Sequence, residues 1–194
     1  MILGIAITLV VLFFLSVLRL FVSRFVSRNF SQVVPFLQRD NPEILADLLN
    51  PAIEKQLSDC LTRKQLRREQ LDRIRLAQEY IARRTHNVVV WQEWADTELR
   101  KSRATLNKEV RIAAEELVRG CAEYRIGTSS VQAQLRIWQL KLLLLPIAEA
   151  PSISRLRRID EFDLLQSYER VKDAALELAD LCGGDYCDQL SHAL

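Results

Sequence analysis

The sequence predicts an all-α protein in which a single N-terminal transmembrane helix is followed by a long helical hairpin or elongated antiparallel helical bundle. Three observations support this fold class. No charged side chain occurs between Met1 and Leu18. Neither glycine nor proline occurs between Ala52 and Arg119, a stretch rich in residues that favour helices. Apolar residues beyond Val88 recur at helical spacing.

Composition and charge bound the class of protein. Of 194 residues, 49% are hydrophobic and the formal net charge is only +2, which excludes a disordered chain. The 27 basic residues face 25 acidic ones, so the balance does not indicate nucleic acid as a partner. The predicted organisation is a transmembrane anchor with a basic juxtamembrane end at 1–28, a linker with a short helix at 29–51, a helical hairpin or bundle domain at 52–182 and a flexible tail at 183–194.

The anchor is predicted from an apolar run over residues 2–22, which reaches the roughly 20 residues that a bilayer requires if Arg19 extends to the headgroups. A cleaved signal peptide and a buried core helix are the alternatives, but the basic residues follow the run instead of preceding it. Arg19, Arg24 and Arg28 lie beside the membrane on roughly one helical face, and no acidic residue precedes Asp40. The positive-inside rule therefore predicts an outside N-terminus and a cytoplasmic C-terminal domain.

The first elements after the anchor are short. A cap at Asp40 and Asn41, with Pro42 in the first turn, predicts a helix over 43–49 that Asn50 and Pro51 end. A helix with a weaker apolar face follows from residue 52. Thr85, His86 and Asn87 precede three valines and are poor helix formers, so a kink is expected there, and the continuity of the helix through Thr85–Val90 is left open.

A long apolar stripe is the strongest periodic signal. Its residues are spaced by 3, 4 and 4 in an eleven-residue repeat, which predicts a straight stripe on one face of a helix that packs against a partner. The stripe consists of Val88, Trp91, Ala95, Leu99, Ser102, Leu106, Val110, Ala113, Leu117, Cys121 and Tyr124.

The chain is expected to reverse at Gly127, because Thr128, Ser129 and Ser130 follow it as a turn and a helix cap. The next helix, over residues 131–145, is apolar around most of its circumference near its end, so it is predicted to be the most buried element outside the membrane. Its charge-free run is too short to span a bilayer, and a shallow re-entrant membrane contact is the alternative.

The last predicted helix runs from about Ser154 to Leu181. It carries a seam with alternating steps of 4 and 3, which suits packing against one partner helix. The seam consists of Leu164, Tyr168, Val171, Ala175 and Leu178.

Charge is distributed unevenly between these helices. Residues 51–84 carry nine basic and five acidic side chains, whereas residues 159–194 carry two basic and nine acidic ones. A reversal at Gly127 places the last helix beside residues 73–95, with its acidic end near the arginines at 67–75. The alternative is that these charges simply solvate two exposed faces.

The sequence contains no recognisable catalytic or cofactor motif. No phosphate-binding or dinucleotide-binding glycine pattern is present, and neither His86 nor His192 follows a glutamate by three residues, as di-iron bundles require. Cys182 and Cys187 form half of a possible zinc site or a small disulfide loop, but no second pair of ligands lies nearby in sequence. We therefore expect no metal, no cofactor, no small-molecule substrate and no nucleic acid.

These observations predict a membrane-anchored, non-enzymatic helical scaffold or assembly subunit that acts through helix–helix packing. Its expected partners are the lipid bilayer and either a second protein or another copy of the chain. The alternative is an envelope-bridging protein, spanin-like or an export accessory factor, whose helical domain lies outside the cytoplasm. In that case Cys182 and Cys187 are expected to be oxidised. An enzyme with a buried site is a third, less favoured class.

Overall fold

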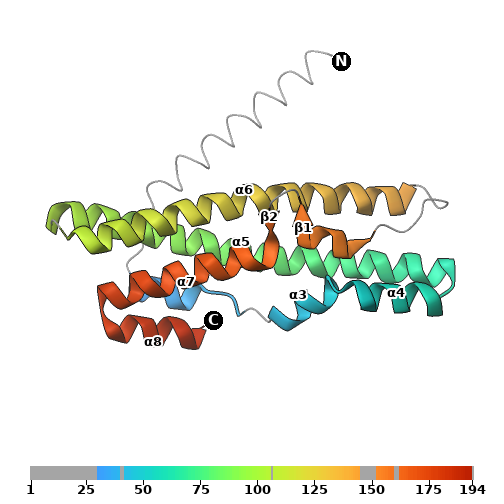
Figure 1. The fold of residues 1–194 in the computed structure, drawn as a ribbon, viewed down its shortest axis with the longest axis horizontal. Coiled ribbons are helices and arrows are strands. Elements are labelled where there is room, and N and C mark those ends of the chain that lie inside the picture. Colours follow the sequence, from blue (N-terminus) through green and yellow to red (C-terminus); the bar gives the residue numbers. More distant parts are fainter. Residues whose placement is uncertain (1–29, 40–41, 106, 145–151, 160–161, 194) are drawn as a thin grey trace, which may run out of the picture.

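The computed structural model describes residues 30–39, 42–105, 107–144, 152–159 and 162–193, which form an elongated helical bundle (Figure 1). Its two longest helices, α5 (Arg63–Thr105) and α6 (Lys108–Leu144), lie antiparallel and pack along each other. Helix α7 (Leu164–Cys182) packs against α6. The predicted helical class is confirmed for this part of the chain, with one small two-stranded sheet as an addition.

The membrane anchor predicted at 1–28, with Arg19, Arg24 and Arg28, lies outside the described residues. Among the helices that are described, none combines the length and the apolar character needed to cross a bilayer.

An N-terminal strap, residues 30–60, runs along α5 in the opposite direction. It comprises α2 (Phe30–Val33), the 3-10 helix η1 (Val34–Phe36), α3 (Pro42–Leu48) and α4 (Pro51–Cys60). The side chain of Asn50 begins α4 by accepting a hydrogen bond from the Ala52 backbone at 2.9 Å. Thr62 then begins α5, because both its N–H and its hydroxyl donate to Gln65 Oε1, at 3.1 and 2.6 Å. The stretch without glycine or proline, residues 52–119, is therefore not one helix.

The chain reverses between Thr105, where α5 ends, and Lys108, where α6 begins, and not at Gly127. The predicted position of this turn, here called the 106–107 turn, is therefore wrong. Asn107 supplies the start of α6, since its Oδ1 accepts a hydrogen bond from Val110 N at 3.3 Å. The apolar stripe is divided by this turn, and its two halves lie on α5 and α6. Helix α5 continues without a break from Thr85 to Val90.

Gly127 lies inside α6, where its lack of a side chain makes room for an aromatic ring. A Cβ at this position would lie 2.4 Å from ring carbons of Phe162. Phe162 belongs to the antiparallel pair of strands β1 (Arg158–Ile159) and β2 (Phe162–Asp163). The glycine is therefore a packing requirement and not a helix stop.

The last long helix begins later than the predicted Ser154. The 3-10 helix η2 (Ile153–Arg157) and the two strands come first, and Asp163 then caps α7 by accepting hydrogen bonds from Leu165 N and Gln166 N, both at 3.0 Å. Helix α7 runs antiparallel to α6, so its acidic end lies near the 106–107 turn. The predicted approach of that end to the arginines at 67–75 is wrong, because Leu181 and Cys182 lie beside Thr105 and Asn107, at the other end of α5.

The C-terminal residues form helix α8 (Gly184–Ala193) instead of the predicted flexible tail. Gly183, with a φ of 154°, separates α7 from α8. The ring of Tyr186 stacks on Phe30 with a centroid separation of 4.0 Å, and Leu190 is completely buried. Packing against the strap therefore holds the end of the chain in place.

Replacing Gly127 by alanine is expected to destabilise the protein by about 1–3 kcal/mol, because the new methyl group overlaps the ring of Phe162. Gly120→Ala in the same helix is the control: its nearest neighbour is Val171 Cγ2 at 3.5 Å, an ordinary contact. Alanine also favours helix over glycine by about 1 kcal/mol, so this variant is expected to be neutral or stabilised. Urea unfolding of the full chain in mild detergent measures both. Equal effects would contradict the packing of Phe162 on α6.

Candidate functional site

The most densely connected buried group is Tyr168 on α7. Its ring lies 5.7 Å from Trp91 and 5.6 Å from Tyr124, measured between centroids. The guanidinium carbon of Arg84 lies 4.5 Å from the same centroid, in a cation–π contact. Asn87 Nδ2 donates to the Tyr168 hydroxyl at 3.2 Å. These side chains join α5, α6 and α7.

Asn87 also holds the N-terminal strap. The backbone N–H of Gln38 donates to Asn87 Oδ1, and Asn87 Nδ2 donates to the Gln38 carbonyl, both at 2.8 Å. The neighbouring His86 contacts the Phe36 carbonyl through Nε2 at 3.0 Å. The polar triplet that the sequence suggested as a kink therefore fixes the strap to α5, and His86 makes a backbone contact.

The sequence-predicted packing residues lie between the helices. The seam of α7 is buried along its length, at Leu164, Tyr168, Val171, Ala175 and Leu178. The stripe is buried at Val88, Trp91 and Ala95 on α5 and at Val110, Ala113, Leu117 and Tyr124 on α6, while Leu99 is partly buried. Leu106 lies outside the described residues. Among the described residues, the stripe and the seam contact each other and line the core of the bundle.

A second polar connection joins α4 to the start of η2. The Glu54 carboxylate accepts hydrogen bonds from Ile153 N at 2.9 Å, Ser154 N at 3.2 Å and the Ser152 hydroxyl at 3.0 Å. Burial acts to raise the pKa of Glu54, but the hydrogen bonds from Ile153, Ser154 and Ser152 outweigh it and hold the pKa below its ordinary value.

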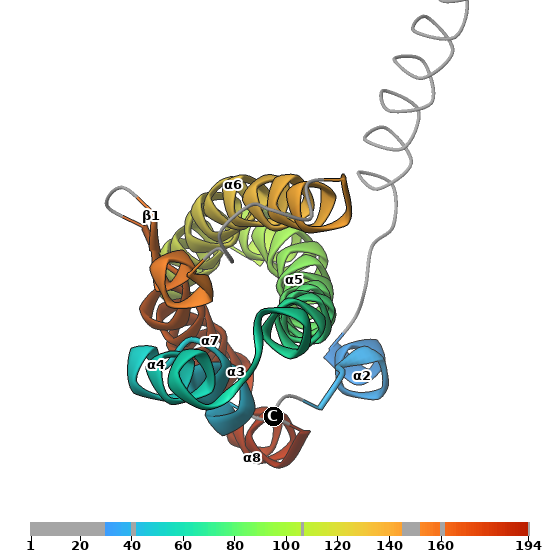
Figure 2. The ribbon, with the colours of Figure 1, turned by 90° about the vertical axis from the view of Figure 1, so that its right-hand side faces the viewer.

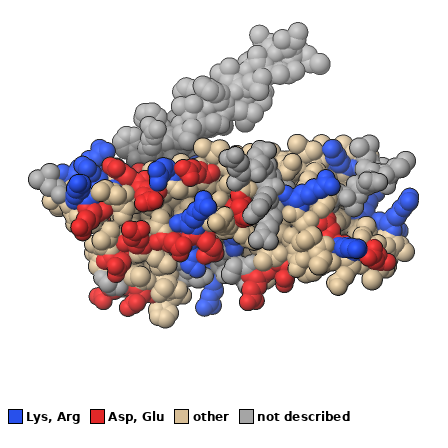
Figure 3. Space-filling model, in the orientation of Figure 1, with Lys and Arg blue, Asp and Glu red and all other residues tan. Residues whose placement is uncertain are grey.

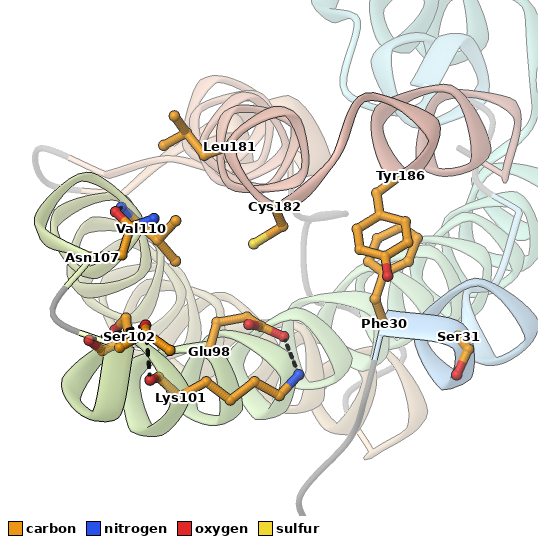
Figure 4. A pocket seen from close by; sticks show the side chains of 11 residues that line it. Phe30, Ser31, Glu98, Lys101, Ser102, Asn107, Val110, Leu181, Cys182 and Tyr186 are labelled. Carbon is orange, nitrogen blue, oxygen red and sulfur yellow. Dashed lines mark hydrogen bonds and ion pairs between the residues drawn. The ribbon is translucent and has the colours of Figure 1, made fainter.

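A cavity of about 720 Å³ lies near the 106–107 turn, between α5, α7 and the strap (Figure 4). The two charged residues that line it are paired: Glu98 accepts hydrogen bonds from Lys101 Nζ at 2.8 Å and from Trp94 Nε1, outside the lining, at 3.2 Å. The Cys182 sulfur points into the space (Figure 4). Burial, followed by the nearby Glu98 carboxylate, raises the pKa of Cys182 to about 11, so the thiol is protonated at neutral pH and is a poor nucleophile.

The four cysteines are free thiols, and Cys187 is partly buried in α8. Burial raises the pKa of Cys121 to about 12, which fits its position in the core. Within the described ranges, no group of three or more His, Cys, Asp and Glu side chains is arranged to hold a metal ion.

The C-terminal half of α6 carries a row of apolar and small side chains on its solvent side, here called the α6 outer face. The exposed fractions of its large side chains are 71% for Ile126, 52% for Ile137, 57% for Leu140 and 66% for Leu144. Val131, Leu135 and Leu142 on the opposite side are buried. The full face, in steps of 4 and 3, is Ile126, Ser130, Ala133, Ile137, Leu140 and Leu144.

This face corrects the prediction that residues 131–145 are the most buried element. The segment is apolar as predicted, but α5 and β1 cover only one side of the helix. The sequence signal for this region is its charge. No acidic residue occurs between Glu123 and Glu149, and the only basic residues there are Arg125, Arg136 and Lys141. Exposed apolar surface of this extent is typical of an interaction site.

The chain matches no protein-family model, no curated protein and no solved structure. The described residues form an elongated helical bundle with an aromatic core. One side of the C-terminal half of its helix α6 is exposed to solvent.

Asn87→Ala is expected to destabilise the protein by about 1–3 kcal/mol, because both backbone groups of Gln38 lose their partner. Hydrogen–deuterium exchange of the strap is expected to accelerate around Gln38. The control is Gln92→Ala, which removes a peripheral hydrogen bond from Arg125 and is expected to change stability by less than about 0.5 kcal/mol. Unchanged exchange at Gln38 in the Asn87 variant would show that this connection does not hold the strap.

Glu54→Gln is expected to lower the melting temperature at pH 7, with a difference from wild type that shrinks in acid. Because the folded-state pKa is lowered, the ionised carboxylate stabilises the fold at neutral pH, and this contribution disappears as the pH falls through that pKa. Thermal melts between pH 7 and about pH 3 measure it. Glu115→Gln is the matched control, since Glu115 makes only an exposed 3.8 Å pair with Arg111. If the difference in melting temperature between Glu54→Gln and wild type did not change with pH, the ionised Glu54 carboxylate would not be what stabilises the fold.

Proposed function

We propose that the protein is a membrane-anchored, non-enzymatic helical scaffold or assembly subunit that acts through helix–helix packing, with its bundle in the cytoplasm. The observation that carries this proposal is the α6 outer face. The other long apolar faces of the described bundle are buried against each other, whereas Ile126 and Leu144 are 71% and 66% exposed. A helix face of this kind suits a partner helix.

The membrane anchor is supported by the sequence of residues 1–28 and by the position of Phe30. Phe30 is 3% exposed and packs against Trp94 and Tyr186, with centroid separations of 5.2 and 4.0 Å. The bundle thus begins almost immediately after the predicted anchor. A helix ending near Arg28 would hold the bundle directly beside the bilayer, with basic residues at the headgroups.

A scaffold is favoured over an enzyme by the contacts of the ionisable groups in the cavity near Cys182. Glu98 is committed to Lys101 and Trp94, and the Cys182 thiol is held protonated. The protonated Cys182 thiol is a poor nucleophile at neutral pH, which favours a structural role for this cavity.

Deleting residues 1–28 is expected to move the protein from the carbonate-resistant membrane fraction to the soluble fraction, while its far-ultraviolet helical signal persists. The exposed Cys60 reports the orientation: a membrane-impermeant thiol reagent is expected to leave it unlabelled in intact cells and to label it after lysis. Labelling in intact cells would instead support the envelope-bridging arrangement.

A truncated protein that resists carbonate extraction without aggregating would contradict the single anchor. Wild-type protein extracted in mild detergent is expected to migrate as an assembly larger than one chain.

A further inference from the structure

We infer that the α6 outer face binds the same face of a second copy of this chain, with the two α6 helices antiparallel. The inference rests on the proposed function, because it names the partner in the helix–helix packing. The face extends from Ile126 to Leu144, a segment about 28 Å long. Its alternating steps of 4 and 3 are the spacing by which two helices pack along a shared seam.

The side-chain sizes at the four central positions of the face, Ser130, Ala133, Ile137 and Leu140, are complementary to the same positions in reversed order. In an antiparallel pair centred between Ala133 and Ile137, each small residue lies opposite a large one of the second copy. Ser130 lies opposite Leu140, and Ala133 lies opposite Ile137. The large residues at the two ends, Ile126 and Leu144, lie opposite each other. Large side chains therefore fill the space that the small ones leave, as close packing requires.

A parallel pair fits less well. It stacks Ser130 on Ser130 and Ala133 on Ala133, which leaves a gap between the helices beside the wider Ile137 and Leu140 layers. It also brings Arg136 of each copy close to Lys141 of the other. The antiparallel pair makes one like-charge contact, between the two Arg136 side chains near the symmetry axis. Both are solvent-exposed, so they can turn outward into water.

The area available is sufficient for a specific dimer. Leu143, 54% exposed, flanks the face and adds to Ile126, Ile137, Leu140 and Leu144. Ten such side chains from two copies, at about 100 Å² each, bury on the order of 1,000 Å². With the exposed area of these side chains fully buried, this is about the smallest area that a specific interface buries.

The symmetry of the pair is compatible with a membrane. The two-fold axis of antiparallel helices is perpendicular to the plane that contains both of them, so each feature of one copy is repeated on the same side of that plane. In Figure 2, α2 lies to one side of α6. Both copies of Phe30 therefore emerge on one side of the dimer, and both anchors can enter a single bilayer.

The test uses the full chain in its membrane, with the photo-crosslinking residue p-benzoylphenylalanine in place of Ser130. Illumination is expected to give an adduct with the mass of two chains. After trypsin digestion, the antiparallel pair joins residue 130 to the peptide over 137–141, which contains Leu140. A parallel pair joins it to the peptide over 126–136. The same photo-crosslinker in place of Glu169, exposed on α7, is expected to give no two-chain adduct.

Leu140→Glu is expected to reduce the two-chain adduct at least tenfold without changing the melting temperature of the bundle, because Leu140 is 57% exposed. Ile112→Glu is the matched control: Ile112 is 49% exposed on the same helix but lies outside the face, so the adduct is expected to persist. An adduct to lipid, to a different protein or to the peptide over 126–136 would overturn the inference, and so would the absence of any adduct. The two proposals fail independently. If the membrane anchor is wrong, carbonate extraction releases the protein, and the two-chain adduct can still be measured in the soluble fraction.

Discussion

The arrangement of the bundle depends on the buried amide of Asn87. An amide without hydrogen-bond partners inside a protein is costly, and Asn87 is completely buried in the middle of a 43-residue helix. It is accommodated because Gln38 and Tyr168 satisfy it from two other segments. This requirement fixes the strap and α7 against the same turn of α5. The aromatic contacts of Tyr168 with Trp91 and Tyr124 then close the core around that point.

The exposed face follows from a mismatch of helix lengths. Helix α6 has 37 residues and α7 has only 19, so α7 can accompany about half of its neighbour. The β1–β2 pair places Phe162 on Gly127 and so determines where α7 begins. From that level to Leu144, α6 packs against α5 and β1 on one side, while its outer face is exposed to solvent. Gly127 therefore marks the boundary between the covered and the uncovered half of the helix.

The helical class and the residues of the seam were predictable from local patterns, whereas the connections were not. The 3, 4, 4 spacing runs in phase through the 106–107 turn, so periodicity alone cannot reveal it. The local signals were Thr62 with Gln65 and Asn107 ahead of Val110, which cap helices without glycine or proline. The role of Gly127 depends on Phe162, and the order of α8 depends on Tyr186 stacking on Phe30. Both contacts join residues far apart in sequence, and no local pattern encodes them.

The apolar character of residues 131–144 is also a local pattern, but the described bundle buries only one side of it, at Val131, Leu135 and Leu142. The charge distribution is consistent with burial between two copies. Acidic side chains gather over α7, whereas basic ones lie toward both ends of the bundle (Figure 3). The acid-rich α8 lies on the opposite side of the bundle from α6 (Figure 2). Pairing through α6 keeps these acidic helices at the outer edges of the dimer, where water screens them. The surface free of acidic residues is thus the one that can approach its own copy, and the acidic surface remains open to solvent.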